Sequence, residues 1–294
     1  AKALGILLNN PGPFVLDNTG TVTAQQAKDI ATLLQGRTNV SLARPLQISD
    51  NAASILAAKD ALFSSGAPTI SSVKINGDVN ASQAAQFEDL GSTFAKFDSF
   101  RIVDTAENAL ALDLSPPTHT TLNSKISGIR VTSALDTSLL STIYPTITNQ
   151  GPVIDPGKGN VLAKLLSGLE VSGSPASISD QIIRVAKLAS DGKLRSINTA
   201  VPANFASTDV TNFQKDLRDN NLSDFPLSLS VADSISSLLR TDATEQQNVL
   251  TNLKRLDSTG LLKSIYAVDQ GQVASLSISQ ASSLSTILDS IGLG

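Results

Sequence analysis

The chain is built from short runs in which apolar and polar residues alternate, each followed by a stretch with helical periodicity. Residues 46–50, Leu-Gln-Ile-Ser-Asp, alternate with the period of two that is typical of a β-strand with one buried face. In residues 52–63, Ile55, Leu62 and Phe63 instead fall on one stripe of a helix. The same strand and helix pattern recurs at 100–104 before 106–112, at 169–174 before 176–189, and at 227–233 before 235–239.

A second kind of predicted strand follows a recurring sequence motif, Leu-x-x-x-Gly with Ser-Ile a few residues later. The motif occurs at residues 188–197 and again at residues 256–265. A Gly just beyond a helical stretch is typical of a helix C-cap, and the Ser-Ile pair begins the next apolar run. Ile129, Ile197 and Ile265 follow one another at intervals of 68 residues, and a looser copy ends at Val73. We therefore expect these four residues to occupy equivalent sites in a buried sheet.

Helical stretches follow these strands as well. They cover residues 82–97, 207–217 and 281–291. Residues 14–17 and 22–27 are predicted to form one strand and helix unit that is not preceded by a unit of the first kind, so the array begins within a repeat. Strands that alternate with helices favour parallel pairing through right-handed crossovers. Self-similarity at a fixed interval is typical of stacked structural units. The predicted fold class is α/β, a repeat solenoid with a parallel sheet on one side and helices on the other.

Three places interrupt the repeats. Residues 114–120 contain paired prolines, which cannot continue a helix, and are predicted to form a loop. Residues 240–244 are expected to separate two helices at a capping Thr or Asp. Residues 151–159, Gly-Pro-Val-Ile-Asp-Pro-Gly-Lys-Gly, are predicted to be a hinge. The expected organisation is N-terminal solenoid repeats over residues 1–150 and C-terminal solenoid repeats over residues 151–294, continuous across this Gly/Pro hinge.

Composition adds that the repeats are low in charge and in aromatic residues. The hydrophobic fraction is 41% but the aromatic share is only 4%, so the core must consist mostly of Leu, Ile, Val and Ala. Charged residues make up 16%, and the surface is filled instead with Ser, Thr, Asn and Gln. The net charge is −4 and the pI about 5.0, so the chain lacks the basic footprint that nucleic-acid binding requires. Nucleic acid is not an expected partner.

The absence of cysteine excludes disulfides, thiolate catalysis and Cys-ligated zinc. Cysteine-free chains are common among bacterial proteins that are exported unfolded to the cell surface, and a cytosolic protein is the alternative. The longest apolar runs are far shorter than the roughly 18 to 20 residues of a membrane span, so we expect a soluble protein. The chain shows neither an initial Met nor a signal peptide, which predicts a fragment or a processed form.

An Asp ends most of the predicted strands and is the first candidate for chemistry. Its copies are Asp17, Asp50, Asp104, Asp233 and Asp269. One carboxylate per coil could form a ladder of oxygen ligands for calcium, but the glycine-rich nonapeptide of calcium-binding β-rolls is absent. Capping is the simpler interpretation, since a carboxylate before a helix accepts hydrogen bonds from free amides and complements the helix dipole. Asp78 and Asp155 fit ordinary turns.

His119 is the only histidine, so a catalytic triad or a histidine metal site would have to use it. It lies beside paired prolines without a Gly-x-Ser-x-Gly motif, and is expected to be a solvated loop residue. The segment 157–160, Gly-Lys-Gly-Asn, lacks the spacing of a phosphate-binding loop. Glu88 and Asp89 are adjacent on a predicted helix, so their side chains point to different sides and cannot flank one glycosidic bond.

Isolated aromatic residues are the last candidates. Tyr144, Tyr266, Phe100 and Phe205 could stack on sugars if exposed, but such residues more often fill the core. The densest basic cluster, Lys254-Arg255, is expected on a solvated helix face. The sequence therefore predicts no catalytic, cofactor-binding or metal-binding residue and favours a protein that is not an enzyme. Calcium is the one cofactor left as an alternative, without a supporting motif.

Several of these phrases resemble those of a known class of repeats. Residues 48–55, 103–110 and 263–265 resemble the "V-x-D-T-A-x-N-I … L-x-x-L … G-K-I-x-S-I" repeats of very large alphaproteobacterial secreted surface proteins. The resemblance extends from about residue 13 to residue 291, with a poor match over residues 114–160. Many of those proteins look like type I secretion substrates, adhesins or S-layer-like proteins. The resemblance implies a coil of solenoid rather than an active site.

The function expected from these patterns is that of a structural or adhesive repeat module of a secreted or cell-surface bacterial protein. Open ends of a solenoid expose unpaired strands and favour stacking, so the expected partners are other copies of the chain or neighbouring repeats. The apolar stretches 1–8 and 288–293 are candidates for such contacts. A surface glycan or a host protein is the alternative partner. The alternative function is a polysaccharide-binding or polysaccharide-acting extracellular domain on a repeat scaffold.

Overall fold

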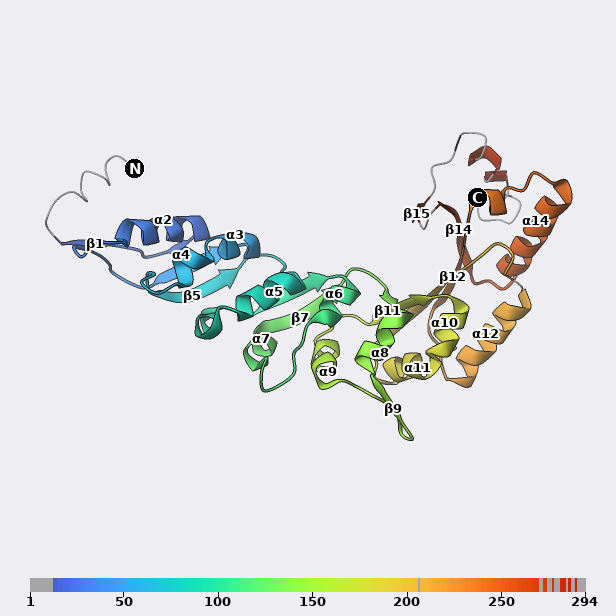
Figure 1. Ribbon diagram of the computed structural model, residues 1–294, viewed down its shortest axis with the longest axis horizontal. Coiled ribbons are helices and arrows are strands. Elements are labelled where there is room, and N and C mark those ends of the chain that lie inside the picture. Colours follow the sequence, from blue (N-terminus) through green and yellow to red (C-terminus); the bar gives the residue numbers. More distant parts are fainter. Residues whose placement is uncertain are drawn as a thin grey trace. The chain divides into compact units, whose positions relative to one another are not determined.

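The chain forms two compact units, each of which is a mixed α/β structure with parallel strands and helices (Figure 1). The computed structural model describes residues 13–205 and 207–269, together with residues 272–273, 277, 281–283, 285–286 and 289. The first unit is Ala1–Thr132 with Pro156–Leu166, and the second is Ser133–Asp155 with Ser167–Gly294. The predicted terminal contact 1–8 lies outside the described residues, and so do all residues of the contact 288–293 except residue 289. Five residues of the predicted last helix, 281–291, also lie outside them.

In the first unit, short strands pair in parallel and helices follow them. The elements are β1 (Phe14–Leu16), β2 (Thr21–Val22), α2 (Ala24–Leu34), β3 (Val40–Leu42), β4 (Leu46–Asp50), α3 (Ala52–Ala57), α4 (Lys59–Phe63), β5 (Ile70–Ile75), α5 (Ala81–Glu88), the 3-10 helix η1 (Gly91–Lys96), β6 (Phe100–Asp104), α6 (Ala106–Ala111), α7 (Thr120–Lys125), β7 (Ile126–Val131) and α9 (Pro156–Ala163). The strand orders are β1-β3, β2-β4-β5 and β6-β7. Helices α2, α3, α5 and α6 contact one another in succession.

The second unit is built on one larger sheet. Its elements are β8 (Leu135–Asp136), the 3-10 helix η2 (Thr137–Leu139), α8 (Leu140–Ile143), β9 (Thr146–Thr148), β10 (Gly151–Val153), β11 (Leu169–Gly173), α10 (Pro175–Asp180), α11 (Ile182–Ser190), β12 (Leu194–Val201), α12 (Ser207–Asp219), β13 (Leu227–Asp233), α13 (Ile235–Leu238), α14 (Ala243–Asp257), β14 (Leu262–Asp269) and β15 (Gln272–Val273). The sheet order is β8-β11-β12-β13-β14-β15, parallel except for the last pair. Strands β9 and β10 form an antiparallel hairpin.

Four strand pairs share the same register and the same irregularity. Their central partners are Ile48 with Val73, Ile102 with Ile129, Val171 with Ile197, and Val231 with Ile265. In every pair the register shifts between the two residues that precede the central residue of the first strand. All of these side chains are at most 8% exposed, and burying each stabilises the fold by about 1.5–3 kcal/mol. The predicted equivalence of Val73, Ile129, Ile197 and Ile265 is confirmed.

A third segment pairs with the first strand of each of these pairs on its other side. The pairs of residues are Val22 with Ile48, Val79 with Ile102, Leu135 with Val171, and Val201 with Val231, all parallel. The third segment is a strand in three cases and an isolated bridge at Val79 in the other. The same arrangement of three paired segments therefore occurs twice in the first unit and twice in the second.

In three of these arrangements, an Asp at the end of the middle strand binds the backbone just beyond the third segment. Its Oδ2 atom accepts a hydrogen bond from the backbone N–H of an Ala two residues beyond the third segment's paired residue, at 2.9–3.0 Å. Its Oδ1 atom accepts from the N–H of the residue that follows it, at 2.7–2.8 Å. The Asp and Ala pairs are Asp50 with Ala24, Asp104 with Ala81, and Asp233 with Ala203. We refer to these three side chains as the linking carboxylates.

The linking carboxylates correct the expected capping role. The N-cap of the following helix is the next residue, Asn51, Thr105 or Ser234, whose side chain accepts from the third helical N–H. The Asp itself belongs to the strand. Asp50 and Asp104 each satisfy the first amide of the preceding helix, at Ala24 and Ala81, and Asp233 satisfies the N–H of Ala203 in the turn before α12. The sequence therefore indicates the correct kind of interaction but the wrong helix.

The arrangement centred on Val171 lacks a linking carboxylate. Gly173 stands at the Asp position, and a Cβ atom there would lie only 2.8 Å from Thr137 Oγ1 and 2.7 Å from Ser177 Oγ. Thr137 occupies the position that Ala holds in the other arrangements, two residues beyond Leu135. A larger residue at one position is thus matched by a smaller one at the other. Thr137 is buried, with 3% of its surface exposed.

The predicted glycine caps are confirmed. Gly66, Gly192 and Gly260 have φ values of 85°, 69° and 70°, a conformation that favours glycine. After α11 the N–H of Lys193 donates to the carbonyl of Leu188 at 3.0 Å, and the N–H of Gly192 donates to Ala189 at 2.9 Å. These two bonds form a Schellman motif, which ends the helix and releases the chain into β12.

Two predicted helices are each broken in two. Residues 52–63 form α3 and α4, which separate at Ala58, and residues 176–189 lie within α10 and α11, which separate at Gln181. Helix α3 contacts both α2 and α5, whereas α4 contacts α2; α10 contacts α12, whereas α11 contacts α8. After each break, one half therefore contacts a helix that is not a main neighbour of the other half. Residues 240–244 separate α13 from α14, as predicted, with Asp242 as the N-cap.

The predicted hinge at residues 151–159 is wrong as local structure. Residues 151–153 form β10, and the segment from Pro156 to Ala163 forms α9, so the Gly-Lys-Gly-Asn segment is helical. Pro156 suits the first turn of a helix, and the buried Gly157 leaves space for close packing. Lys158 and Asn160 donate side-chain hydrogen bonds to the carbonyls of Leu112 and Leu114, which hold the helix in the first unit. The expected boundary at residue 150 does not coincide with the two units.

Removing a linking carboxylate should destabilise the protein more than removing an exposed Asp. In Asp233→Ala, the N–H groups of Ala203 and Ser234 lose their acceptor, and we expect a loss of about 2–3 kcal/mol in the free energy of unfolding. Asp224→Asn, at an exposed turn position in the same unit, is the matched control and should change the free energy by less than about 0.5 kcal/mol. Urea unfolding measures both, and equal losses would contradict the linking role.

Candidate functional site

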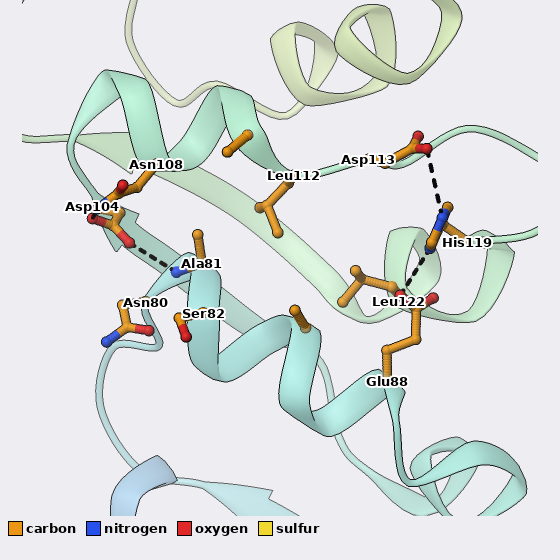
Figure 2. A pocket seen from close by; sticks show the side chains of 12 residues that line it. Asn80, Ala81, Ser82, Glu88, Asp104, Asn108, Leu112, Asp113, His119 and Leu122 are labelled. Carbon is orange, nitrogen blue, oxygen red and sulfur yellow. Dashed lines mark hydrogen bonds and ion pairs between the residues drawn. The ribbon is translucent and has the colours of Figure 1, made fainter.

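A cavity of about 450 Å³ lies between α5, α6 and α7 in the first unit (Figure 2). Its apolar lining comes from Ala85, Ala111, Leu112 and Leu122. Polar side chains gather at two ends, one near the start of α5 and one near its end. The volume is within the range of about 300–1,000 Å³ that is common for small-molecule sites.

The sequence of α5 positions both ends of the cavity. Its N-cap, Asn80, forms a capping box with Gln83, which fixes where the helix starts. Ala81, Ala85 and Glu88 follow at spacings of four and three residues, so they share one helix face. Because Ala has almost no side chain, this face leaves room in the middle and places a carboxylate at the end.

His119 lies at the second end, between two carboxylates. Its Nδ1 atom is 2.8 Å from Glu88 Oε2, and its Nε2 atom is 3.6 Å from Asp113 Oδ2. Because an ionised carboxylate only accepts hydrogen bonds, Nδ1 carries a proton. The hydrogen bond to Glu88 raises the pKa of His119; burial opposes this shift, and the negative charges of Glu88 and Asp113 add to it. The imidazolium form is thus favoured.

Asp113 is held by a local turn. Its Oδ1 atom accepts from the backbone N–H of Ser115 at 2.8 Å and from the Ser115 hydroxyl at 2.6 Å. These hydrogen bonds lower the pKa of Asp113, and the charges of His119 and Lys158 contribute to the same direction. Asp113 is therefore ionised at neutral pH, with its second oxygen facing His119.

Asp104, one of the linking carboxylates, lies at the first end of the cavity. Burial by itself would raise its pKa, but hydrogen bonds from the Asn108 side chain and from the N–H groups of Ala81 and Thr105 outweigh burial and lower it. The three donors lie 2.8–2.9 Å from its oxygens. A carboxylate has about four lone-pair positions, so one acceptor position remains. The cavity thus has an ionised carboxylate at each end.

The structure corrects the interpretation of His119. It is only 27% exposed and is bound to a residue 31 positions away, so it is not a solvated loop residue. Glu88 and Asp89 do diverge as predicted, because Glu88 faces His119 while Asp89 forms the C-cap of α5. Asp113 was not recognised from the sequence, and no local spacing connects it to Glu88.

The aromatic and basic residues considered as candidates from the sequence lie in the core, in strands or on an exposed helix face. Phe100 and Tyr144 are buried, with 4% and 0% exposure, as predicted for core residues. The Tyr144 hydroxyl donates to Asp191 at 2.9 Å, and burial raises its pKa. Phe205 is partly buried against the core of the second unit. Lys254 and Arg255 are exposed on the last turn of α14, as predicted, and Tyr266 lies in β14.

The remaining carboxylates do not lie together. Asp78 binds Arg101 at 2.5 Å and Arg130 at 3.4 Å, so it is an ion-pair partner rather than a simple turn residue. Asp17 follows β1, Asp155 precedes α9, and the side chain of Asp269 lies outside the described residues. Within the part of the chain that the structure describes, no group of three or more His, Asp or Glu side chains is placed to hold a metal ion.

Comparisons with known proteins give no functional assignment. No protein-family model matches the chain, and no curated protein sequence matches it. Among the helices in the described residues, none combines the length and the apolar character needed to cross a bilayer.

The pair of His119 and Glu88 should make stability depend on pH. The pKa of His119 is about 6.5 when unfolded and higher when folded, so its stabilising contribution is present below about pH 6.5 and is lost as the pH rises through the folded pKa. We expect His119→Gln to cost more stability at about pH 5.5 than at about pH 8.5. Urea midpoints of wild type and variant at both pH values measure this difference. An identical difference at both pH values would contradict the pairing. In a Glu88→Gln background the pH dependence of the difference should be smaller, because only the charge of Asp113 then favours the imidazolium.

Proposed function

We propose that the chain is a repeat solenoid that acts as a structural or adhesive module of a secreted or cell-surface bacterial protein. The observation that carries the proposal is the same register of two parallel strands, with the same irregularity, in four places. A unit that repeats its own pairing geometry offers each copy the same surface for stacking. Helices α10, α12 and α14 contact one another in succession in the second unit, as α2, α3, α5 and α6 do in the first.

Polar side chains on the sheet of the second unit support a role in partner binding. The Asn198 side chain donates to Glu170 and accepts from Ser228, so that a polar chain crosses β11, β12 and β13. Ser230 and Ser264 continue it to β14, with their hydroxyls 2.9 Å apart. A surface of hydroxyl and amide groups suits hydrogen bonding to another copy of the chain, to a glycan or to a host protein.

A role without catalysis is proposed on the geometry of the cavity. Both ring nitrogens of His119 face carboxylates, and no hydroxyl within hydrogen-bonding distance of that ring is recorded among the described residues. An activated nucleophile requires such a contact between the base and a hydroxyl or thiol. Export to the cell surface is proposed from the absence of cysteine and from the resemblance of the repeats to those of secreted surface proteins.

Small-angle scattering tests the solenoid. A single compact domain of 294 residues would have a radius of gyration of about 19 Å. A continuous solenoid extends along one axis, so we expect a radius well above that value and a scattering curve with a rod-like region. A compact radius for the monomer would overturn the solenoid.

Self-assembly is tested separately by electron microscopy at rising protein concentration, with and without calcium. Open solenoid ends favour end-to-end stacking, and we expect filaments or lattices whose abundance rises with concentration. Sedimentation of the same samples gives the size distribution. Monomers under every condition would contradict self-assembly and leave binding to a different partner as the proposed role.

A further inference from the structure

The cavity beside His119 combines an open interior with an acidic group at each end. Two of its lining residues, His119 and Leu122, belong to the part of the sequence that departs from the repeat pattern, and Leu112 and Asp113 lie immediately before that part. Coils that follow the pattern do not need these residues. A departure from a regular scaffold that creates a cavity is typical of a functional site.

The charges in and around the cavity favour a cation. Three carboxylates line it, from Glu88, Asp104 and Asp113, and among the described residues the lining includes no Lys or Arg. His119 lies between two of these carboxylates, and Lys158 acts on Asp113 from outside the lining. With His119 protonated or neutral, the carboxylates outnumber the positive charges.

The shape of the cavity favours a long ligand with charge at both ends. The first acidic end is fixed at Ala81, whose N–H binds Asp104, and the second is fixed at Glu88. Between these residues α5 rises by about 10 Å, at roughly 1.5 Å per residue. The intervening surface, from Ala85 and Leu112, is apolar and accommodates methylene groups rather than hydroxyls (Figure 2).

We propose that this cavity binds a linear aliphatic diamine or polyamine, with one ammonium group near Asp104 and the other near Glu88 and Asp113. The ammonium groups donate hydrogen bonds to the acceptor positions that the protein leaves open, and the methylene chain lies along the alanine face of α5. This binding activity goes beyond the structural role and does not depend on it. A neutral sugar matches the volume but neither the charge nor the apolar middle.

Titration calorimetry with octamethylenediamine tests the proposal at about pH 8.5. We expect saturable binding of one diamine per chain. Trimethylenediamine is too short to reach both ends, octylamine has one ammonium group and octanediol has none, so each should bind more weakly. Equal binding of octylamine would overturn the two-ended arrangement. No binding of octamethylenediamine, or binding of glucose in its place, would overturn the proposal as a whole.

Variants locate the site. Glu88→Gln should weaken octamethylenediamine binding by about threefold or more, the factor expected for two unit charges roughly 6 Å apart in water. Glu107→Gln removes the same charge from an exposed position on α6 and is the matched control, with a smaller expected effect. Equal effects of the two substitutions would show that the cavity is not the site. Circular dichroism melting of both variants separates a loss of binding from a loss of folding.

The pH dependence gives an independent readout. Lowering the pH to about 5.5 protonates His119, whose imidazolium repels the nearby ammonium group, so wild-type affinity should fall by about threefold. His119→Gln removes that charge and should bind the diamine with nearly the same affinity at both pH values. A variant with the same pH dependence as wild type would contradict binding next to His119.

Discussion

The fold depends on the hydrogen bonds that the linking carboxylates accept. The first amides of a helix have no partner within the helix, and leaving them unpaired in a partly buried position costs free energy. Asp50 and Asp104 each satisfy one such amide from the neighbouring strand, and Asp233 satisfies the N–H of Ala203 in the turn before α12. Each Asp also binds the N–H of the residue after it. The side chain is short, so the strand end and the helix start must stay in contact. That constraint holds the strand end against the neighbouring segment in three arrangements. In the fourth, the close approach of Gly173 to Thr137 occurs at the same place, and the register and its irregularity are the same in all four.

The regular part of the fold could be predicted from the sequence because its determinants are local. Alternation in residues 46–50 and 227–233 identifies strands, and the glycine after Leu188 identifies the end of a helix. The same local signals predict the wrong structure where contacts with distant residues determine the conformation of a segment. Gly157 and Gly159 predict a hinge, but burial of Gly157 and the bonds of Lys158 and Asn160 to residues 46 positions earlier stabilise a helix there.

The candidate site could not be predicted for the same physical reason. Glu88 and His119 are 31 residues apart, and their contact depends on how α5 and the loop before α7 are placed by the whole unit. The sequence marked His119 as unusual because it is the only histidine and marked Glu88 as part of an acidic pair. It contained no signal that would bring the two together. Asp113 lies in the irregular loop before α7, where neither strand nor helix periodicity predicts which way its side chain points.

Thr137 and Gly173 stand where the other arrangements have Ala and Asp, and this replacement limits how duplications and deletions can change the length of the chain. In three arrangements the pair is Ala with Asp, and in the fourth it is Thr with Gly, where a Cβ on the glycine would collide with the threonine. One member of each pair lies in a strand and the other in a helix or turn, and the two are separated by up to 36 residues of chain. A duplication or deletion that recombines the Thr and Gly arrangement with one of the other three, and cuts between the two members, would combine an Ala with a Gly, leaving an amide without its acceptor, or a Thr with an Asp, producing a collision. Exchange between these two kinds of arrangement therefore preserves the contacts only when its boundaries lie outside the pair.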